Sequence, residues 1–157
     1  MSPLPPFEIT VKSGRLAVRH ALQRLLDRLG PLELELEEAS TVELVLAEAL
    51  NNIVEHAYGA QRGAGPICIR CTHKTDGLHL RILDQGSIMP DGPLPKVANA
   101  TPTTLRCDLP EGGFGWFMIQ DLAKDVTYAR IGAENRLDLR LAVALPTSPQ
   151  PGEQRRP

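Results

Sequence analysis

Three polar side chains recur at four-residue spacing in the apolar segment VELVLAEALNNIVEHAY, which covers residues 42–58. They are Glu48, Asn52 and His56. On a helix of 3.6 residues per turn, side chains four apart lie nearly above one another, so these three form a polar stripe beside an apolar one. A carboxylate and an amide held against a buried face offer hydrogen-bonding groups that need a ligand. Taken alone, such a stripe is more often a solvated helix edge.

Two glycine-containing stretches further along the chain carry related chemistry. A strand runs into Asp84-Gln85-Gly86, which places a carboxylate at a strand end where glycine allows close backbone approach. Gly112, Gly113 and Gly115 precede an apolar helix in EGGFGWFMIQDLAKDV, and a glycine-rich helix start presents free N–H groups to an anion. The alternative for Asp84-Gln85-Gly86 is an ordinary turn, and the alternative for the glycine-rich stretch is a simple hinge before a core helix.

Hydrophobic periodicity predicts the elements that would position these groups. In chain order we expect a strand at 7–11, helices at 14–29 and 42–58, a strand hairpin at 66–74 and 78–83, a helix after Gly115, and a final hairpin at 126–131 and 137–145. Ser40 or Thr41 is expected to cap the central helix, unless Thr41 already lies inside it, and Gly59 to end it in a left-handed conformation. Residues 32–36 are either a short strand or a lead-in to that helix.

The remaining segments are expected to lack regular structure. Residues 87–111 have no periodicity and contain five prolines, which is typical of a lid, a binding segment or disorder. The proline-rich ends predict a disordered lead at 1–6 and a disordered tail at 146–157. One domain, at 7–145, remains between them.

Composition restricts the class of protein. The chain has 157 residues, of which 42% are hydrophobic and 23% charged, which fits one globular domain. A net charge of -2 and a pI near 6.1, with scattered lysines and arginines, argue against nucleic-acid binding. No apolar run approaches the ~20 residues of a membrane span, so a cytoplasmic protein without membrane contact is expected.

In this order, the segments EALNNIVEHAY, ILDQG and EGGFGWFMIQDLAKDVTY resemble the three sequence boxes of the Bergerat-type ATPase domain. Gyrase, sensor histidine kinases and the anti-sigma factor serine/threonine kinases share that domain, and the chain is most similar to the last family. The resemblance covers roughly residues 7–145. It implies a two-layer α/β sandwich, in which three helices cover one face of a mixed, mostly antiparallel sheet of about five strands.

The resemblance also implies roles for three of the polar residues. Asn52 matches the Mg²⁺ ligand, and a neutral oxygen donor suits a hard cation that phosphate and water also coordinate. Glu48 matches the general base, which would take a proton from a serine hydroxyl or a water. Asp84 matches the acceptor of the adenine amino group. Guanine carries a carbonyl there, so two acceptors would face each other and ATP should be preferred.

The other positions carried over by the resemblance surround the nucleotide. Gly86 would leave room for the base, while Gly113 and Gly115 would let the lid and the helix start approach the phosphates. His56 fits the family pattern after the asparagine, where packing or hydrogen bonding is favoured over catalysis. Asn135 lies near the position at which many relatives place a threonine close to the adenine.

Asn135, in place of that threonine, and Ile88 both depart from the usual pattern of the family. Ile88 stands where the second box commonly has its last glycine, which predicts a differently placed start of the lid. Arg106 lies within the expected lid and is a candidate to reach a terminal phosphate, although that loop has no firm alignment to the family.

These implications converge on a Mg²⁺-dependent, ATP-binding serine/threonine protein kinase of the anti-sigma type. Its expected partners are ATP, a small anti-sigma antagonist protein as phosphate acceptor, and a sigma factor, with a homodimer as an option. Phosphate on the antagonist adds negative charge that can break a complex, as partner switching requires. The alternative is a non-catalytic module that binds ATP and sequesters a regulator. A histidine-kinase ATPase domain is disfavoured because no helix pair with a phospho-accepting histidine precedes these boxes.

Overall fold

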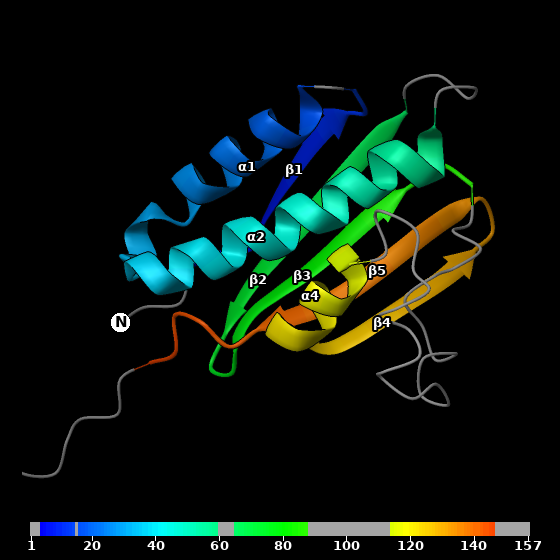
Figure 1. Ribbon diagram of the computed structural model, residues 1–157. Coiled ribbons are helices and arrows are strands. Elements are labelled where there is room, and N and C mark those ends of the chain that lie inside the picture. The colour runs from blue at the N-terminus through cyan, green and yellow to red at the C-terminus, as the bar shows by residue number, and fades with distance from the viewer. Residues whose placement is uncertain (1–3, 15, 60–64, 88–113, 147–157) are drawn as a thin grey trace, which may run out of the picture.

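The computed structural model describes residues 4–14, 16–59, 65–87 and 114–146. This part of the chain forms two layers, with three α-helices on one face of a five-stranded sheet (Figure 1). The regular elements in chain order are β1 (Phe7–Lys12), α1 (Ala17–Arg28), α2 (Leu36–Asn52), β2 (Pro66–Lys74), β3 (Gly77–Asp84), α4 (Phe114–Leu122), β4 (Lys124–Ile131) and β5 (Glu134–Leu141). The predicted two-layer α/β class is therefore confirmed.

The strand order in the sheet is β1-β2-β3-β5-β4, and all four pairings are antiparallel. The expected mixed sheet thus contains no parallel pair among the described strands. Both predicted hairpins are present, and each turns through two residues. Because β5 lies between β3 and β4, the end of β3 is bordered on one side by β2 and on the other by the last hairpin.

The core lies between the sheet and the helices. Alternate residues of β2 point toward the helices, and Ile67, Ile69 and Cys71 are buried there. Burial raises the pKa of the Cys71 thiol to about 12, so this cysteine stays protonated and behaves as a small apolar residue. The opposite face of the sheet is charged: the carboxylate of Asp138, for example, accepts a hydrogen bond of 2.7 Å from Arg81 Nε.

The central helix begins earlier than the sequence analysis predicts. Glu35 and Glu38 form a capping box at its start, in which Glu38 Oε2 accepts the Glu35 N–H at 3.3 Å. Ser40 and Thr41 are inside the helix, where their hydroxyls donate to carbonyls four residues earlier. The predicted caps are therefore wrong, because a pair of glutamates takes that function. The helix begins at Leu36. Of the two alternatives for residues 32–36, a short strand or a lead-in to the helix, the lead-in is therefore correct.

The end of the central segment changes helix type. Residues Ile53–Tyr58 form a π-helical turn, labelled η2, and its Gly59 N–H donates to Val54 O at 3.2 Å, five residues back. Gly59 has the positive φ, 56°, that favours glycine, but its ψ of 176° lies outside the left-handed helical conformation that the sequence predicts for the stop. The wider turn rotates later residues away from the α-helical stripe. Asn52, before the turn, is buried, whereas the side chain of His56, within it, is 49% exposed.

The final strand ends sooner than its alternation of leucines suggests. The predicted strand to residue 145 stops at Leu141, and Ala144 has a φ of 54°, outside the range of a strand. Glu38 Oε1 accepts the Ala144 N–H at 3.1 Å, and His73 Nε2 lies 3.0 Å from Ala144 O. The Leu4 N–H donates to His73 Nδ1 at 3.1 Å, so a residue of the predicted lead is joined to the same cluster.

Candidate nucleotide site

Asp84 ends β3 and is 2% exposed. Its Oδ1 accepts two hydrogen bonds, from the Gly86 N–H at 2.9 Å and from Asn135 Nδ2 at 2.8 Å. Its Oδ2 has no partner among the described residues. Burial raises the pKa of the Asp84 carboxyl, while the two N–H donors and the Arg130 charge work in the opposite direction. The site thus holds a buried carboxylate with one satisfied and one open oxygen.

Asn135 is fully buried and pairs with Asp84 across β5 and β3. The predicted strands leave residues 132–136 as the turn, but the turn is only two residues long and Asn135 is already in β5. Its Nδ2 also donates to Ser87 O at 2.9 Å, and its Oδ1 accepts from Arg130 NH1 at 2.9 Å. The amide of Asn135 therefore braces the chain that follows β3.

Gly86 packs directly against the π-helical turn. A Cβ placed on Gly86 would lie 2.4 Å from Ala57 O, and the Ser87 N–H donates to the same carbonyl at 2.7 Å. The Tyr58 hydroxyl also accepts the Gln85 N–H at 2.9 Å. Close approach of two backbones, rather than a special φ, is thus the reason for a glycine here. The Asp84-Gln85-Gly86 turn is held from both β5 and η2.

Asn52 is the last residue of α2 and is 3% exposed. Its Nδ2 is buried and has no hydrogen-bond partner in the described chain. Rotation of the amide by half a turn exchanges its nitrogen and oxygen, so this unpaired position can hold either a donor or an acceptor. A buried polar atom without a partner is costly, and a ligand that satisfies it removes the cost. The amide therefore fits a role as an oxygen ligand of a cation or as a donor to phosphate.

Glu48 lies one turn before Asn52 on α2 and is half-buried. No described residue forms a hydrogen bond or an ion pair with its carboxylate. Two of the three residues of the predicted stripe, Glu48 and Asn52, thus lie one turn apart, and no hydrogen bond from the described chain occupies the Glu48 carboxylate or Asn52 Nδ2. His56 is further round the helix and its charged neighbour is Glu55, with Nε2 and Oε2 separated by 3.8 Å.

The remaining predicted residues lie at or beyond the edge of the described chain. The predicted helix is present, but it begins at Phe114, so Gly115 is its second residue and does not precede it as predicted. Gly113, Arg106, Ile88 and the rest of the expected lid, residues 88–111, lie outside the described residues.

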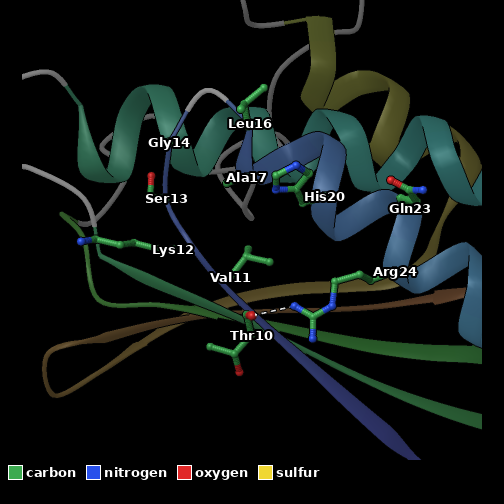
Figure 2. Close-up of a pocket in the computed structure, with 10 residues that line it drawn as sticks. All are labelled: Thr10, Val11, Lys12, Ser13, Gly14, Leu16, Ala17, His20, Gln23 and Arg24. Carbon is green, nitrogen blue, oxygen red and sulfur yellow. Dashed lines mark hydrogen bonds between the residues drawn. The ribbon is translucent and has the colours of Figure 1, made fainter.

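A separate cavity of about 570 Å³ opens between β1 and α1 (Figure 2). None of the predicted site residues lines it. The Arg24 guanidinium, which borders the cavity, already donates to Thr10 O at 3.1 Å, and Figure 2 shows the Lys12 side chain directed away from it. No carboxylate lines this cavity to accept an adenine amino group, so the nucleotide assignment stays with Asp84.

Comparison with known proteins agrees with this geometry. Residues 10–141 match the histidine kinase-like ATPase domain, and the chain belongs to that family. Its fold is similar to a crystal structure of the RsbU and RsbW domains of Rv1364c from Mycobacterium tuberculosis, with a TM-score of 0.61 and 17% identity. That match covers 88% of this chain but 32% of the other, so this chain spans about a third of it. No curated protein matches the sequence.

Family membership identifies a Bergerat-type domain and implies ATP as its ligand. None of the helices in the described residues has the length and apolar character to cross a membrane. Sequence reasoning missed two residues that hold the Asp84 turn, Tyr58 and Arg130. Neither stands out by spacing, since each meets the turn only through tertiary contacts. Tyr58 is the last residue of the first box, and Arg130 lies just after the third, so the ends of these two boxes carry the available signal.

Proposed function

We propose that this protein is a Mg²⁺-dependent, ATP-binding serine/threonine protein kinase of the anti-sigma factor type. Its acceptor would be a serine or threonine on a small anti-sigma antagonist protein, and it would also hold a sigma factor in a partner-switching pathway. The observation that carries the proposal is Asp84, a buried carboxylate with one oxygen that no described residue contacts, in a chain of the ATPase family.

The free oxygen of Asp84 suits adenine. Oδ1 is occupied by two N–H donors, which leaves Oδ2 as the acceptor for the amino group of the base. A guanine carbonyl at this position would meet a second acceptor and lose affinity, because a buried polar group left unpaired costs about 1–3 kcal/mol.

The phosphate end of the proposed site would be served by α2. Asn52 would hold Mg²⁺ through its amide oxygen, and the ion would neutralise charge on the phosphates. Glu48, one turn earlier and without a protein partner, would take the proton of the acceptor hydroxyl as its oxygen bonds to the γ-phosphorus and ADP leaves.

The second candidate function is an ATP-binding module that sequesters a regulator and transfers no phosphate. Fold does not grant activity, so membership of the family supports both candidates. The half-buried, unpaired Glu48 favours the kinase, because a module that only binds does not need a base at this position.

The test is transfer of labelled phosphate from ATP to candidate antagonist proteins. Glu48→Gln should keep ATP affinity and partner binding but lose about 10² to 10⁴-fold in rate, since that is the usual contribution of base catalysis. Asn52→Ala should lose Mg²⁺-dependent ATP binding as well. Glu43→Gln provides the matched control, because it changes an exposed carboxylate of the same helix.

The outcomes separate the two candidates. A wild-type protein that binds ATP and a sigma factor but phosphorylates no cognate antagonist would exclude the kinase and leave the sequestering module. If Glu48→Gln transfers phosphate at the wild-type rate, Glu48 is not the base.

A further inference from the structure

We propose that Arg130 is a positioning residue that sets the adenine preference of the site, by fixing Asn135 and the Gly86 backbone so that Asp84 keeps Oδ2 free as an acceptor. This inference rests on the proposed function, because it concerns how the same site distinguishes ATP from GTP.

The contacts of Arg130 place it behind the site. Its NH1 donates to Gly86 O at 2.6 Å and to Asn135 Oδ1 at 2.9 Å, and its Nε donates to Gly132 O at 3.1 Å. The last bond anchors the guanidinium on its own hairpin, between β4 and β5. From there one nitrogen reaches both the turn after β3 and the side chain that braces it. Only arginine offers such a planar set of donors at fixed angles.

The bond to Asn135 Oδ1 helps to fix how that amide is oriented. Nδ2 donates to Asp84 Oδ1 at 2.8 Å and to Ser87 O at 2.9 Å, while Oδ1 accepts from Arg130 NH1 at 2.9 Å. Rotation of the amide by half a turn would set its oxygen against these two acceptors and its N–H groups against a cation. Arg130 therefore reinforces the single orientation that the acceptors around Nδ2 also favour.

The charges around Asp84 determine when its free oxygen is an acceptor. Burial makes the largest contribution and raises the pKa of Asp84, the nearby Glu134 carboxylate raises it further, and the Arg130 cation lowers it. Tyr58, which packs on the same turn, also carries a raised pKa through burial and stays neutral. Arg130 is thus the cation that opposes protonation of Asp84, and its removal would raise the pKa of Asp84 further.

Protonation would reverse the character of the free oxygen. Because Oδ1 accepts two N–H groups, an added proton must reside on Oδ2. Oδ2 then becomes a hydrogen-bond donor. It can no longer accept from the adenine amino group, but it can donate to the guanine carbonyl. The ratio of ATP to GTP affinity should therefore fall as the pH is lowered, and without Arg130 the fall should occur at higher pH.

The experiment measures dissociation constants for ATP and GTP with the full chain, by titration calorimetry from about pH 5 to about pH 8. The variants are Arg130→Met, Arg130→Lys and Arg81→Met. Arg81 pairs with Asp138 on the opposite face of the sheet, so its replacement makes the same change in net charge away from the site.

Arg130→Met should weaken ATP binding about three- to tenfold near neutral pH, move the loss of ATP preference to higher pH, and leave GTP binding less affected. Arg130→Lys should return the pH profile toward that of the wild type, because it restores the charge, but should recover only part of the affinity. Arg81→Met should behave as the wild type.

Equal weakening of both nucleotides by Arg130→Met, with no displacement along the pH axis, would overturn the inference and leave Arg130 a structural residue. An unchanged ATP to GTP ratio in that variant would also overturn it. Failure of ATP binding, on which the proposed function depends, is distinguishable, because the wild-type protein would then bind no ATP at any pH. Failure of the kinase alone would appear only in the phosphate-transfer test and would leave these nucleotide affinities unchanged.

Discussion

The two carboxylate oxygens of Asp84 have different surroundings. Oδ1 receives a backbone and a side-chain N–H, whereas Oδ2 has no partner in the described chain. Asp84 is 2% exposed and has an oxygen without a described partner, so its ionised form destabilises the folded state. The same burial raises its pKa above the ordinary value. Such a residue is expected where a ligand supplies the missing donor.

Asp84→Asn tests this residue directly. If the amide oxygen takes the place of Oδ1, an NH₂ group stands where Oδ2 was, so ATP binding should fall at least tenfold and GTP should gain relative to ATP. Nucleotide titration measures both. Asp138→Asn, on the charged face of the sheet, is the matched control. Undiminished ATP affinity in Asp84→Asn would contradict the assignment of the adenine contact.

The same variant makes a prediction about stability and pH. The folded pKa of Asp84 is raised, so the folded state binds its proton more tightly than the unfolded state, and ionisation destabilises the fold as pH rises through this range. Asp84→Asn removes that effect. Its melting temperature without nucleotide should equal or exceed that of the wild type at neutral pH and lose this advantage in acid. A lower melting temperature at neutral pH would contradict this expectation.

At the scale of the element, α2 is specified at both ends by contacts with other parts of the chain. At its start, Glu38 accepts the Glu35 N–H through one oxygen and the Ala144 N–H through the other. At its end, the π-helical turn presents Ala57 O to the Ser87 N–H. The helix that carries Glu48 and Asn52 is therefore attached to the segment after β5 and to the turn after β3.

Glu38→Ala should reduce the free energy of unfolding by about 1–2 kcal/mol, because it removes a helix cap and leaves the Ala144 N–H without its acceptor. Urea denaturation measures the change. Glu37→Ala is the matched control, since it removes the same charge from the first turn while Glu37 contributes only its backbone carbonyl to the hydrogen bonds there. Equal losses in both variants would show that charge at the helix start, and not the two hydrogen bonds, explains the effect.

At the scale of the whole molecule, the proposed site joins elements that are distant in the sequence. Asp84 and Asn135 are 51 residues apart, and Arg130 contacts Gly86 across 44 residues. A ligand that bridges α2 and the end of β3 would bind only when these elements are assembled. Its binding therefore stabilises the folded state by mass action.

ATP with Mg²⁺ should consequently raise the melting temperature, and a concentration one hundred times the dissociation constant corresponds to about 2.7 kcal/mol. GTP at the same concentration should produce a much smaller shift, and ATP without Mg²⁺ an intermediate one. Thermal scans of the full chain measure all three. Equal shifts for ATP and GTP would contradict the role of Asp84, and no shift with either would contradict nucleotide binding.

Much of the architecture follows from the sequence alone. Alternation over 66–74 and 78–83 predicts β2 and β3 closely, because a half-buried strand must repeat every two residues. The relation between Glu48 and Asn52 is equally local, since four residues on an α-helix make about one turn whatever surrounds them. The three boxes in order also identify the ATPase domain from local patterns, and the match of residues 10–141 to the histidine kinase-like ATPase domain confirms that broader assignment.

Tertiary structure decided the features that depend on distant partners. The α-helix stops at Asn52, although its apolar pattern continues to Tyr58, and the π-helical turn that follows brings Ala57 O to Ser87. Asn135 and Arg130 become parts of the site because the strand order puts β5 between β3 and β4. Hydrophobic periodicity reports which face of an element is buried, but it contains no information on which strand lies beside it, so these contacts exist only in the assembled sheet.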